Sequence, residues 1–175
     1  IGYWRLGEST GPVAFDASPN NLHGTYVGNV GPGLPGAIAA DSNSAAHFDG
    51  ISGYVNVGAH AALNQLTNDF TIEAWVKGKG PIASTWLPAP PMPEASGFGF
   101  SVPVDPGLGT GSPYDSVLRF TTFGVQDYDH PVEFAVGDWV HVAAVFDSSN
   151  DVTFYINGEN VATIAGTSPA RANLQ

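Results

Sequence analysis

The chain has 175 residues and a formal net charge of −11, with 16 Asp and Glu against 5 Lys and Arg. Such an acidic chain repels polyanions, so we expect no nucleic acid partner, and it contains no run of about 18 apolar residues that could insert into a membrane. With no cysteine in the chain, disulfides and thiolate chemistry are excluded. We expect one domain over residues 1–175.

Alternating apolar and polar residues predict an all-β chain, and 22 Gly and 14 Pro supply its turns. In chain order, strands are expected at residues 3–6, 23–27, 45–48, 54–57, 70–77, 82–84, 98–102, 117–122, 139–146, 152–156 and 161–164. A short helical turn is expected near residues 61–66. The Gly- and Pro-rich segment at residues 31–36 predicts a loop.

Three segments carry the clearest patterns. Residues 70–77 place their apolar side chains on one face and Glu73 and Trp75 on the other, as in a strand with one buried side. Residues 139–146 are apolar at nearly every position, which predicts a central strand covered on both faces. Asn157 and Gly158 separate two β-branched runs, which is the pattern of a hairpin with a type I′ turn.

Two loops are longer than a hairpin needs. Residues 86–96 contain four prolines, which should stiffen the loop around Trp86, and residues 103–116 are rich in Gly and Ser and include Tyr114. Loops of this length are usually either functional or mobile.

Motifs along the chain resemble those of laminin-G-like (concanavalin A-like) jelly-roll domains. They are YWRLGE at 3–8, DASPNNLHG at 16–24, AHFDG at 46–50, YVNV at 54–57, and GDWVHVAAVFD at 137–147 leading to FYING at 154–158. The resemblance covers about residues 1–166. It implies two antiparallel sheets packed face to face, and a place outside the cell or on its surface. Lectins, adhesion modules and surface-protein repeats share this fold, so the fold alone does not choose among them.

The resemblance weakens at the C-terminus. Related domains continue after the hairpin with closing strands that pair beside the N-terminal strand, whereas residues 172–175 stand where the penultimate strand would begin. Without closing strands, the expected strand from Tyr3 to Leu6 would expose unpaired backbone groups. Two explanations remain open: the chain is truncated, or another chain donates the missing strand, as in filament assembly.

No catalytic constellation is recognisable in the sequence. Glycosidases use two carboxylates across a cleft, and only Glu73 lies in the interior of an expected strand, flanked two residues away by Thr71 and Trp75. We therefore predict no enzyme activity. His141 and His47 are interpreted as buried core histidines.

Calcium is the metal that the sequence favours, because it binds Asp, Asn and carbonyl oxygens. The predicted ligands are Asp16, Asn20 and Asn21, which lie within six residues. The alternative is that Asp16 forms an Asx turn that caps its own loop.

A glycan site would need aromatic rings for sugar C–H faces together with polar groups for hydroxyls. The loop aromatics Trp86, Tyr114 and Tyr128 are the candidates, with Asp127 and Asp129 beside the last. One alternative is that Trp86 packs back over the sandwich. Another is that the acidic segment with Asp127 and Asp129 is a solvated loop.

From these observations we predict that the chain is a non-catalytic extracellular binding or assembly module. Its expected partners are other protein subunits or copies of itself. The alternative is a carbohydrate-binding module with calcium-assisted glycan recognition.

Overall fold

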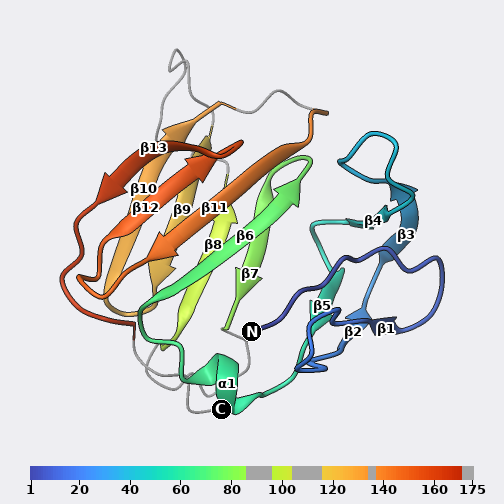
Figure 1. Cartoon of the computed structure of the whole chain (residues 1–175), viewed down its shortest axis with the longest axis horizontal. Helices are drawn as coiled ribbons and strands as arrows, with labels where there is room; N and C mark the ends of the chain where they lie inside the picture. Colours follow the sequence, from blue (N-terminus) through green and yellow to red (C-terminus); the bar gives the residue numbers. More distant parts are fainter. Residues whose placement is uncertain (86–95, 104–115, 134–136, 171–175) are drawn as a thin grey trace. The chain divides into compact units, whose positions relative to one another are not determined.

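The computed structural model describes residues 1–85, 96–103, 116–133 and 137–170. The chain divides into two compact units, Ile1–Leu63 and Asn64–Gln175, both built from antiparallel strands (Figure 1). Among the described residues, no helix has the length and apolar character needed to span a membrane. A single domain over residues 1–175 stays a prediction.

The described residues of the unit Asn64–Gln175 form two four-stranded antiparallel sheets. One sheet has the order β13-β12-β11-β6, and its strands are β6 (Phe70–Val76), β11 (Val140–Phe146), β12 (Val152–Ile156) and β13 (Glu159–Ile164). The other has the order β10-β9-β8-β7, with β7 (Gly80–Ser84), β8 (Phe98–Val102), β9 (Ser116–Thr122) and β10 (Gln126–Val132).

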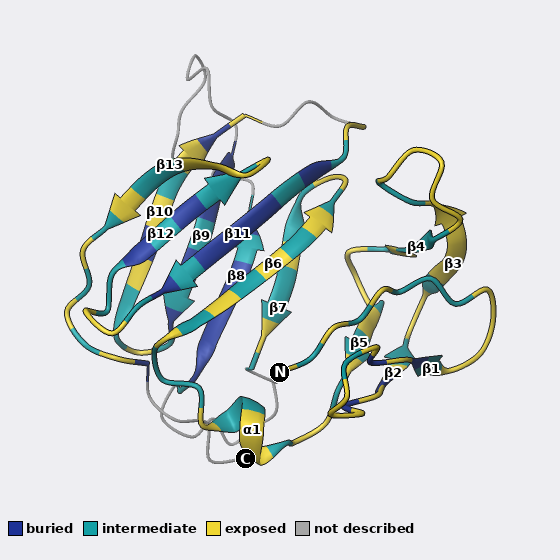
Figure 2. Cartoon of the chain, viewed as in Figure 1, coloured by how far each residue is buried: buried dark blue, intermediate teal, exposed yellow. Residues whose placement is uncertain are grey.

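Aromatic side chains from both sheets form the core between them. Phe120 of β9 and Phe146 of β11 are fully buried, with ring centroids 5.3 Å apart. Phe70 and Phe98 make a similar contact across the sheets at 4.7 Å. The buried positions follow the central strands of both sheets (Figure 2). The predicted all-β, two-sheet antiparallel sandwich is confirmed.

The hairpin between β12 and β13 also forms as predicted. Asn157 and Gly158 have φ values of 51° and 84°, the positive pair that a type I′ turn requires. The Asn157 side chain also accepts a hydrogen bond from the His141 backbone N–H at 3.0 Å, which ties the turn to β11.

The unit Ile1–Leu63 is built from smaller sheets. A three-stranded sheet has the order β1-β2-β5, with β1 (Val13–Ala14), β2 (Gly24–Val27) and β5 (Tyr54–Asn56). A separate hairpin pairs β3 (Val30–Pro35) with β4 (Ser44–Phe48). The expected helical turn forms as α1 (Ala61–Asn64), which begins at the end of this unit.

Three sequence predictions in the first unit are wrong. Residues 3–6 do not form a strand: Trp4 makes one isolated bridge to Asp16, and Leu6, with a φ of 53°, cannot continue an extended chain. Residues 31–36, expected as a loop, belong largely to β3, which tolerates its prolines because it pairs with β4 alone. His47 was expected in the core but is exposed on β4.

Candidate binding surfaces

The predicted calcium ligand Asp16 is buried and surrounded by hydrogen-bond donors from its own unit. Its Oδ1 accepts the backbone N–H groups of Tyr3 and Ser18, both at 2.8 Å. Its Oδ2 accepts the Ser18 hydroxyl at 2.7 Å and the Leu22 N–H at 2.8 Å. Four donors fill the usual acceptor capacity of one carboxylate.

This arrangement does not fit the predicted calcium site. Burial of Asp16 opposes ionisation, but the hydrogen bonds from Tyr3, Ser18 and Leu22 outweigh it and hold the pKa of the carboxyl well below its usual range. The side-chain amides of Asn20 and Asn21 donate to the carbonyl groups of Ile1 and Pro19. The described residues contain no group of three or more His, Cys, Asp or Glu that could hold a metal ion. The geometry matches the alternative, an Asx turn that caps its own loop.

A second carboxylate of the same kind, Asp49, did not emerge from the sequence analysis. Its Oδ1 accepts the N–H groups of Ile51, Ser52 and Gly53 at 2.8–3.0 Å, and its Oδ2 accepts the Ser52 hydroxyl. These bonds lower the pKa of Asp49. The signal that could have revealed this turn is an Asp followed directly by Gly and then Ser-Gly.

The predicted ligand-binding residues Asp127, Tyr128 and Asp129 lie on strand β10, where a loop was expected. The period of two along the strand sends Tyr128 inward and its two acidic neighbours outward. Tyr128 is fully buried against Phe120 and Phe146, so its proposed role as an exposed loop aromatic is wrong.

The two outward carboxylates on β10 share one face, an acid pair that the sequence analysis missed. Both are engaged within the fold. Asp129 accepts two bonds of 2.7 Å from the guanidinium of Arg119, and Asp127 accepts the hydroxyl of Thr121. These bonds occupy part of the hydrogen-bond acceptor capacity of both carboxylates.

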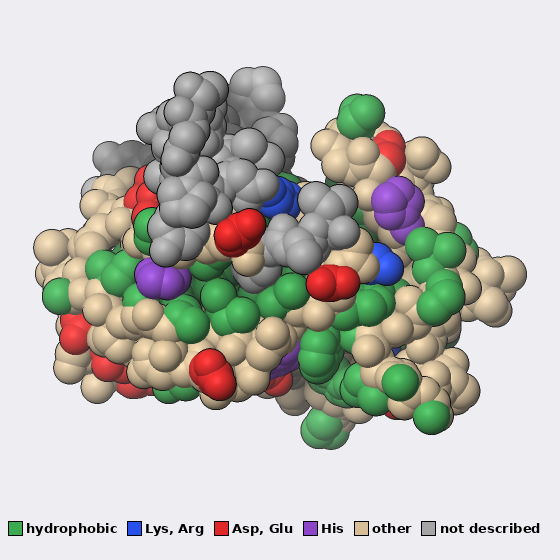
Figure 3. All heavy atoms as spheres, turned by 90° about the horizontal axis from the view of Figure 1, so that it is seen from above, with side chains coloured by type: hydrophobic (Ala, Val, Ile, Leu, Met, Phe, Trp, Pro, Cys, Tyr) green, Lys and Arg blue, Asp and Glu red, His purple; other side chains and the backbone are tan. Residues whose placement is uncertain are grey.

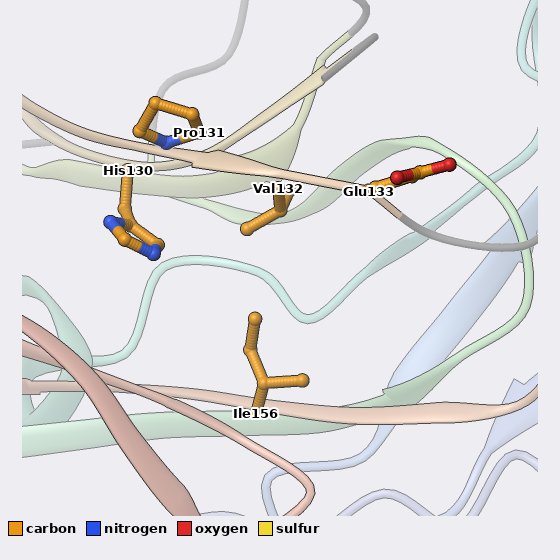
Figure 4. A pocket seen from close by; sticks show the side chains of 5 residues that line it. All are labelled: His130, Pro131, Val132, Glu133 and Ile156. Atoms are coloured by element: carbon orange, nitrogen blue, oxygen red, sulfur yellow. The ribbon is translucent and has the colours of Figure 1, made fainter. Parts of the chain in front are cut away.

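Trp86 and Tyr114, the other predicted glycan contacts, lie outside the described residues. A shallow pocket lies where β10 faces β12, with His130, Val132 and Ile156 pointing toward one another (Figure 4). Pro131 and Glu133 complete its lining. Val132 in the wall of this pocket is a buried apolar residue of the sandwich core, so the pocket is an opening at the end of that core.

The outer face of β6 and β11 brings Glu73 and Trp75 of β6 beside His141 of β11, which is far from them in the sequence. Trp75 pairs with His141 across the two strands, and their ring centroids are 5.3 Å apart. His141 Nε2 lies 3.5 Å from Glu73 Oε2. The prediction that His141 is a buried core residue is wrong, because strand alternation turns it toward the outer face and leaves it partly exposed.

The rest of this outer face mixes apolar and polar side chains, because Ala143 and Val145 lie on it together with threonines. Tyr155 of β12 stands opposite Ala143, the β11 residue that also faces Glu73. The hydroxyls of Thr153 and Thr163 hydrogen-bond to each other at 3.0 Å. Glu73 and Trp75 are among its exposed members, with 67% of the Glu73 side chain and 47% of Trp75 accessible to solvent.

Comparison with known proteins defines the class of the chain. A family model described as the concanavalin A-like lectin/glucanases superfamily matches residues 48–174. No curated protein and no solved structure matches the chain. The match covers well over half of the sequence, and the chain belongs to this superfamily.

The family narrows the range of functions. Laminin-G-like domains are generally non-catalytic binding modules, although the wider superfamily includes glycosidases. The match begins at Phe48 in β4, so the motifs at residues 3–8 and 16–24 precede it. The family model thus covers the whole two-sheet sandwich and the last part of the first unit.

Proposed function

We propose that this chain is a non-catalytic binding and assembly module of an extracellular or cell-surface protein. It associates through residues 1–63 with copies of itself or with other protein subunits. The observation that carries this proposal is the distribution of exposed apolar side chains. Of the eight large hydrophobic residues exposed in the described part of the chain, seven belong to this unit: Ile1, Tyr3, Phe15, Leu34, Ile38, Ile51 and Tyr54.

Such side chains favour association because burying apolar surface contributes roughly 25 cal/mol per Å². Several hydrophobic side chains reach the molecular surface, as the space-filling view shows (Figure 3). Ile51 is 93% exposed at the tip of a turn held by the Asp49 hydrogen bonds. A turn fixed in this way loses little conformational entropy when a partner covers it.

Strand donation beside residues 3–6 is a less favourable route to the same association. The Tyr3 N–H already donates to Asp16 Oδ1, and its carbonyl accepts the Ala17 N–H at 2.7 Å. A strand added on the side that faces Asp16 and Ala17 would have to replace these bonds. We therefore favour side-chain packing over β-augmentation in this unit.

Analytical ultracentrifugation over a wide concentration range tests the proposal in its simplest form, self-association. We expect the wild-type chain to form dimers or larger species, and the double variant Ile38→Ser/Ile51→Ser to shift this equilibrium toward monomer. The matched control is Trp75→Ala, which removes an exposed apolar side chain from the other unit and should leave the equilibrium unchanged. A wild-type chain that stays monomeric at all concentrations would contradict self-association.

Glycan recognition is the second function that we propose, and the exposed Trp75 beside His141 and Glu73 favours it. An aromatic ring offers a stacking surface, while the carboxylate and imidazole offer hydrogen bonds. The four donors already on Asp16 argue against the calcium assistance that the sequence predicted at that loop.

A further inference from the structure

We propose that Asn157 is a site of spontaneous deamidation, and that opening of the hairpin between β12 and β13 sets its rate. In this reaction the Gly158 backbone nitrogen loses its proton and attacks Cγ of the Asn157 side chain. The side-chain amide nitrogen takes up that proton and leaves as ammonia. Water then opens the succinimide ring that has formed, which gives aspartate or isoaspartate at position 157. This modification is independent of both functions proposed above.

The residue that follows Asn157 is the first reason. The sequence contains one Asn-Gly pair, and every other asparagine precedes a residue with a side chain, which crowds the attacking nitrogen. Glycine has no Cβ, and a Cβ placed on Gly158 would meet no atom within 4 Å beyond its chain neighbours. Both residues of the pair are exposed, so water reaches the ring that forms between them.

The closed turn holds the reacting atoms apart. Asn157 and Gly158 have the φ values of a type I′ turn, in which the first residue has a ψ of about +30°. Attack needs a rotation about this ψ that turns the Gly158 nitrogen toward Cγ. The Asn157 side chain is also fixed, because its oxygen accepts the His141 N–H at 3.0 Å. The Asn157 N–H donates to the His141 carbonyl at 2.8 Å. The turn must therefore open before the reaction occurs.

The β12–β13 hairpin is a part of the sheet that can open at low cost. In the order of the described strands, β13 lies at the edge and pairs with β12 alone. None of the six residues of β13 is buried, whereas β11 carries five buried positions. The pairing of β12 with β13 is also irregular between Phe154 and Tyr155. Segments with few buried contacts open locally at the lowest free energy. Opening of this hairpin therefore exposes Asn157 to reaction without unfolding the core.

The products change the turn in two ways. Isoaspartate carries the main chain through its side chain and adds one methylene to the backbone, so the type I′ turn cannot form again with its native geometry. Both products add a negative charge two residues before Glu159, in a chain whose net charge is already −11. Like charges so close together repel. Conversion to isoaspartate thus releases the hairpin from His141 irreversibly.

Peptide mapping by mass spectrometry tests the proposal, with electron-transfer fragmentation to distinguish aspartate from isoaspartate. The chain is incubated in mildly alkaline buffer, once folded and once unfolded in urea. We expect conversion of Asn157 in both samples, and at least about tenfold slower in the folded chain, because only its open fraction reacts. Asn150 and Asn160 are the matched internal controls. They precede Asp151 and Val161, and Asn150 shares the positive φ of Asn157. Both should stay unchanged in the folded chain.

Thermal unfolding of the separated products tests the consequence for the hairpin. The isoaspartate form should melt several degrees below the wild type, because its turn is broken. The variant Asn157→Asp reproduces the other product and keeps a side-chain acceptor for the His141 N–H. It should melt closer to the wild type than the isoaspartate form does. An isoaspartate form that melts like the wild type would overturn the release of the hairpin.

Three results of the peptide mapping would count against the proposal. An Asn157 that stays intact throughout a prolonged incubation of the folded chain would overturn the site. Equal rates in the folded and the unfolded chain would overturn the role of hairpin opening. Equal conversion of Asn150 or Asn160 in the folded chain would show that the glycine and the turn do not select the site, which also overturns the proposal.

Discussion

Different interactions stabilise the interior of each of the two units of this chain. In residues 64–175, phenylalanines from two sheets form a buried aromatic core. In residues 1–63, all of which the structure describes, only Ala14 and Leu22 are buried hydrophobics. There, the carboxylates of Asp16 and Asp49 gather backbone N–H groups from several segments. Exclusion of water dominates in one unit, and local hydrogen bonding in the other.

This difference relates structure to function. A unit that buries its own apolar residues leaves a mostly polar surface, where the exposed Trp75 stands out. A unit that buries few of them leaves many exposed, and these are available to a partner. The units therefore suit different tasks, which we propose are glycan recognition and association.

The largest expected effect comes from the aromatic core. Phe120→Ala should lower the free energy of unfolding by about 3–5 kcal/mol, because it removes a fully buried ring that contacts both sheets. The matched control, Phe15→Ala, removes a phenylalanine that is 55% exposed in the other unit and should change stability by less than about 0.5 kcal/mol. Urea denaturation measures the free energy of unfolding of both variants. Equal losses of this free energy would contradict the proposed difference between the two units.

Acid should affect the first unit before the second. The folded-state pKa values of Asp16 and Asp49 lie below the ordinary value of 3.8, so each carboxylate contributes stability above that pH. This stability is lost as the pH falls below 3.8 toward the folded-state pKa values.

Hydrogen exchange during acid titration can follow the two units separately. Residues 1–63 should lose protection at higher pH than residues 64–175. In Asp16→Asn and Asp49→Asn, this pH-dependent loss should be smaller, because less stability remains to be lost. Asp127→Asn on β10 serves as the control. If both units lost protection at the same pH, and if this pH were unchanged in Asp16→Asn and Asp49→Asn, the role assigned to these carboxylates would be refuted.

The smallest expected effect concerns the ion pair on the outer face of β9 and β10. Arg119 and Asp129 form a bidentate pair, but their side chains are 34% and 36% exposed. Water screens such a pair, so a double-mutant cycle with Arg119→Ala and Asp129→Ala should give a coupling of about 0.2–1 kcal/mol. A coupling several times larger would show that surface electrostatics rivals the core in stabilising this unit.

Several parts of the fold could be predicted from the sequence because their signals are local. The alternation in residues 70–77 identified β6 and its buried face, and Asn157-Gly158 identified the hairpin. Strand β10 was missed because Asp and Pro are uncommon in strands, so its composition resembled a loop. Burial of Tyr128 against two other strands overrides that local preference.

The candidate site could be predicted only in part. Alternation already placed Glu73 and Trp75 together on the face away from the core. Their proximity to His141 depends on the register between β6 and β11, and about 65 residues separate these strands in the sequence.

The all-β class, most strands and the side chains that share a face could be predicted from the sequence, because a strand's period of two is a local property. Which strands are neighbours could not be predicted in this way. Pairing across long separations depends on how whole faces bury one another, and this pairing sets Trp75 beside His141. In the first unit, three backbone N–H groups and the Ser18 hydroxyl occupy the Asp16 carboxylate, which decides between the Asx turn and the calcium site that its loop sequence left open.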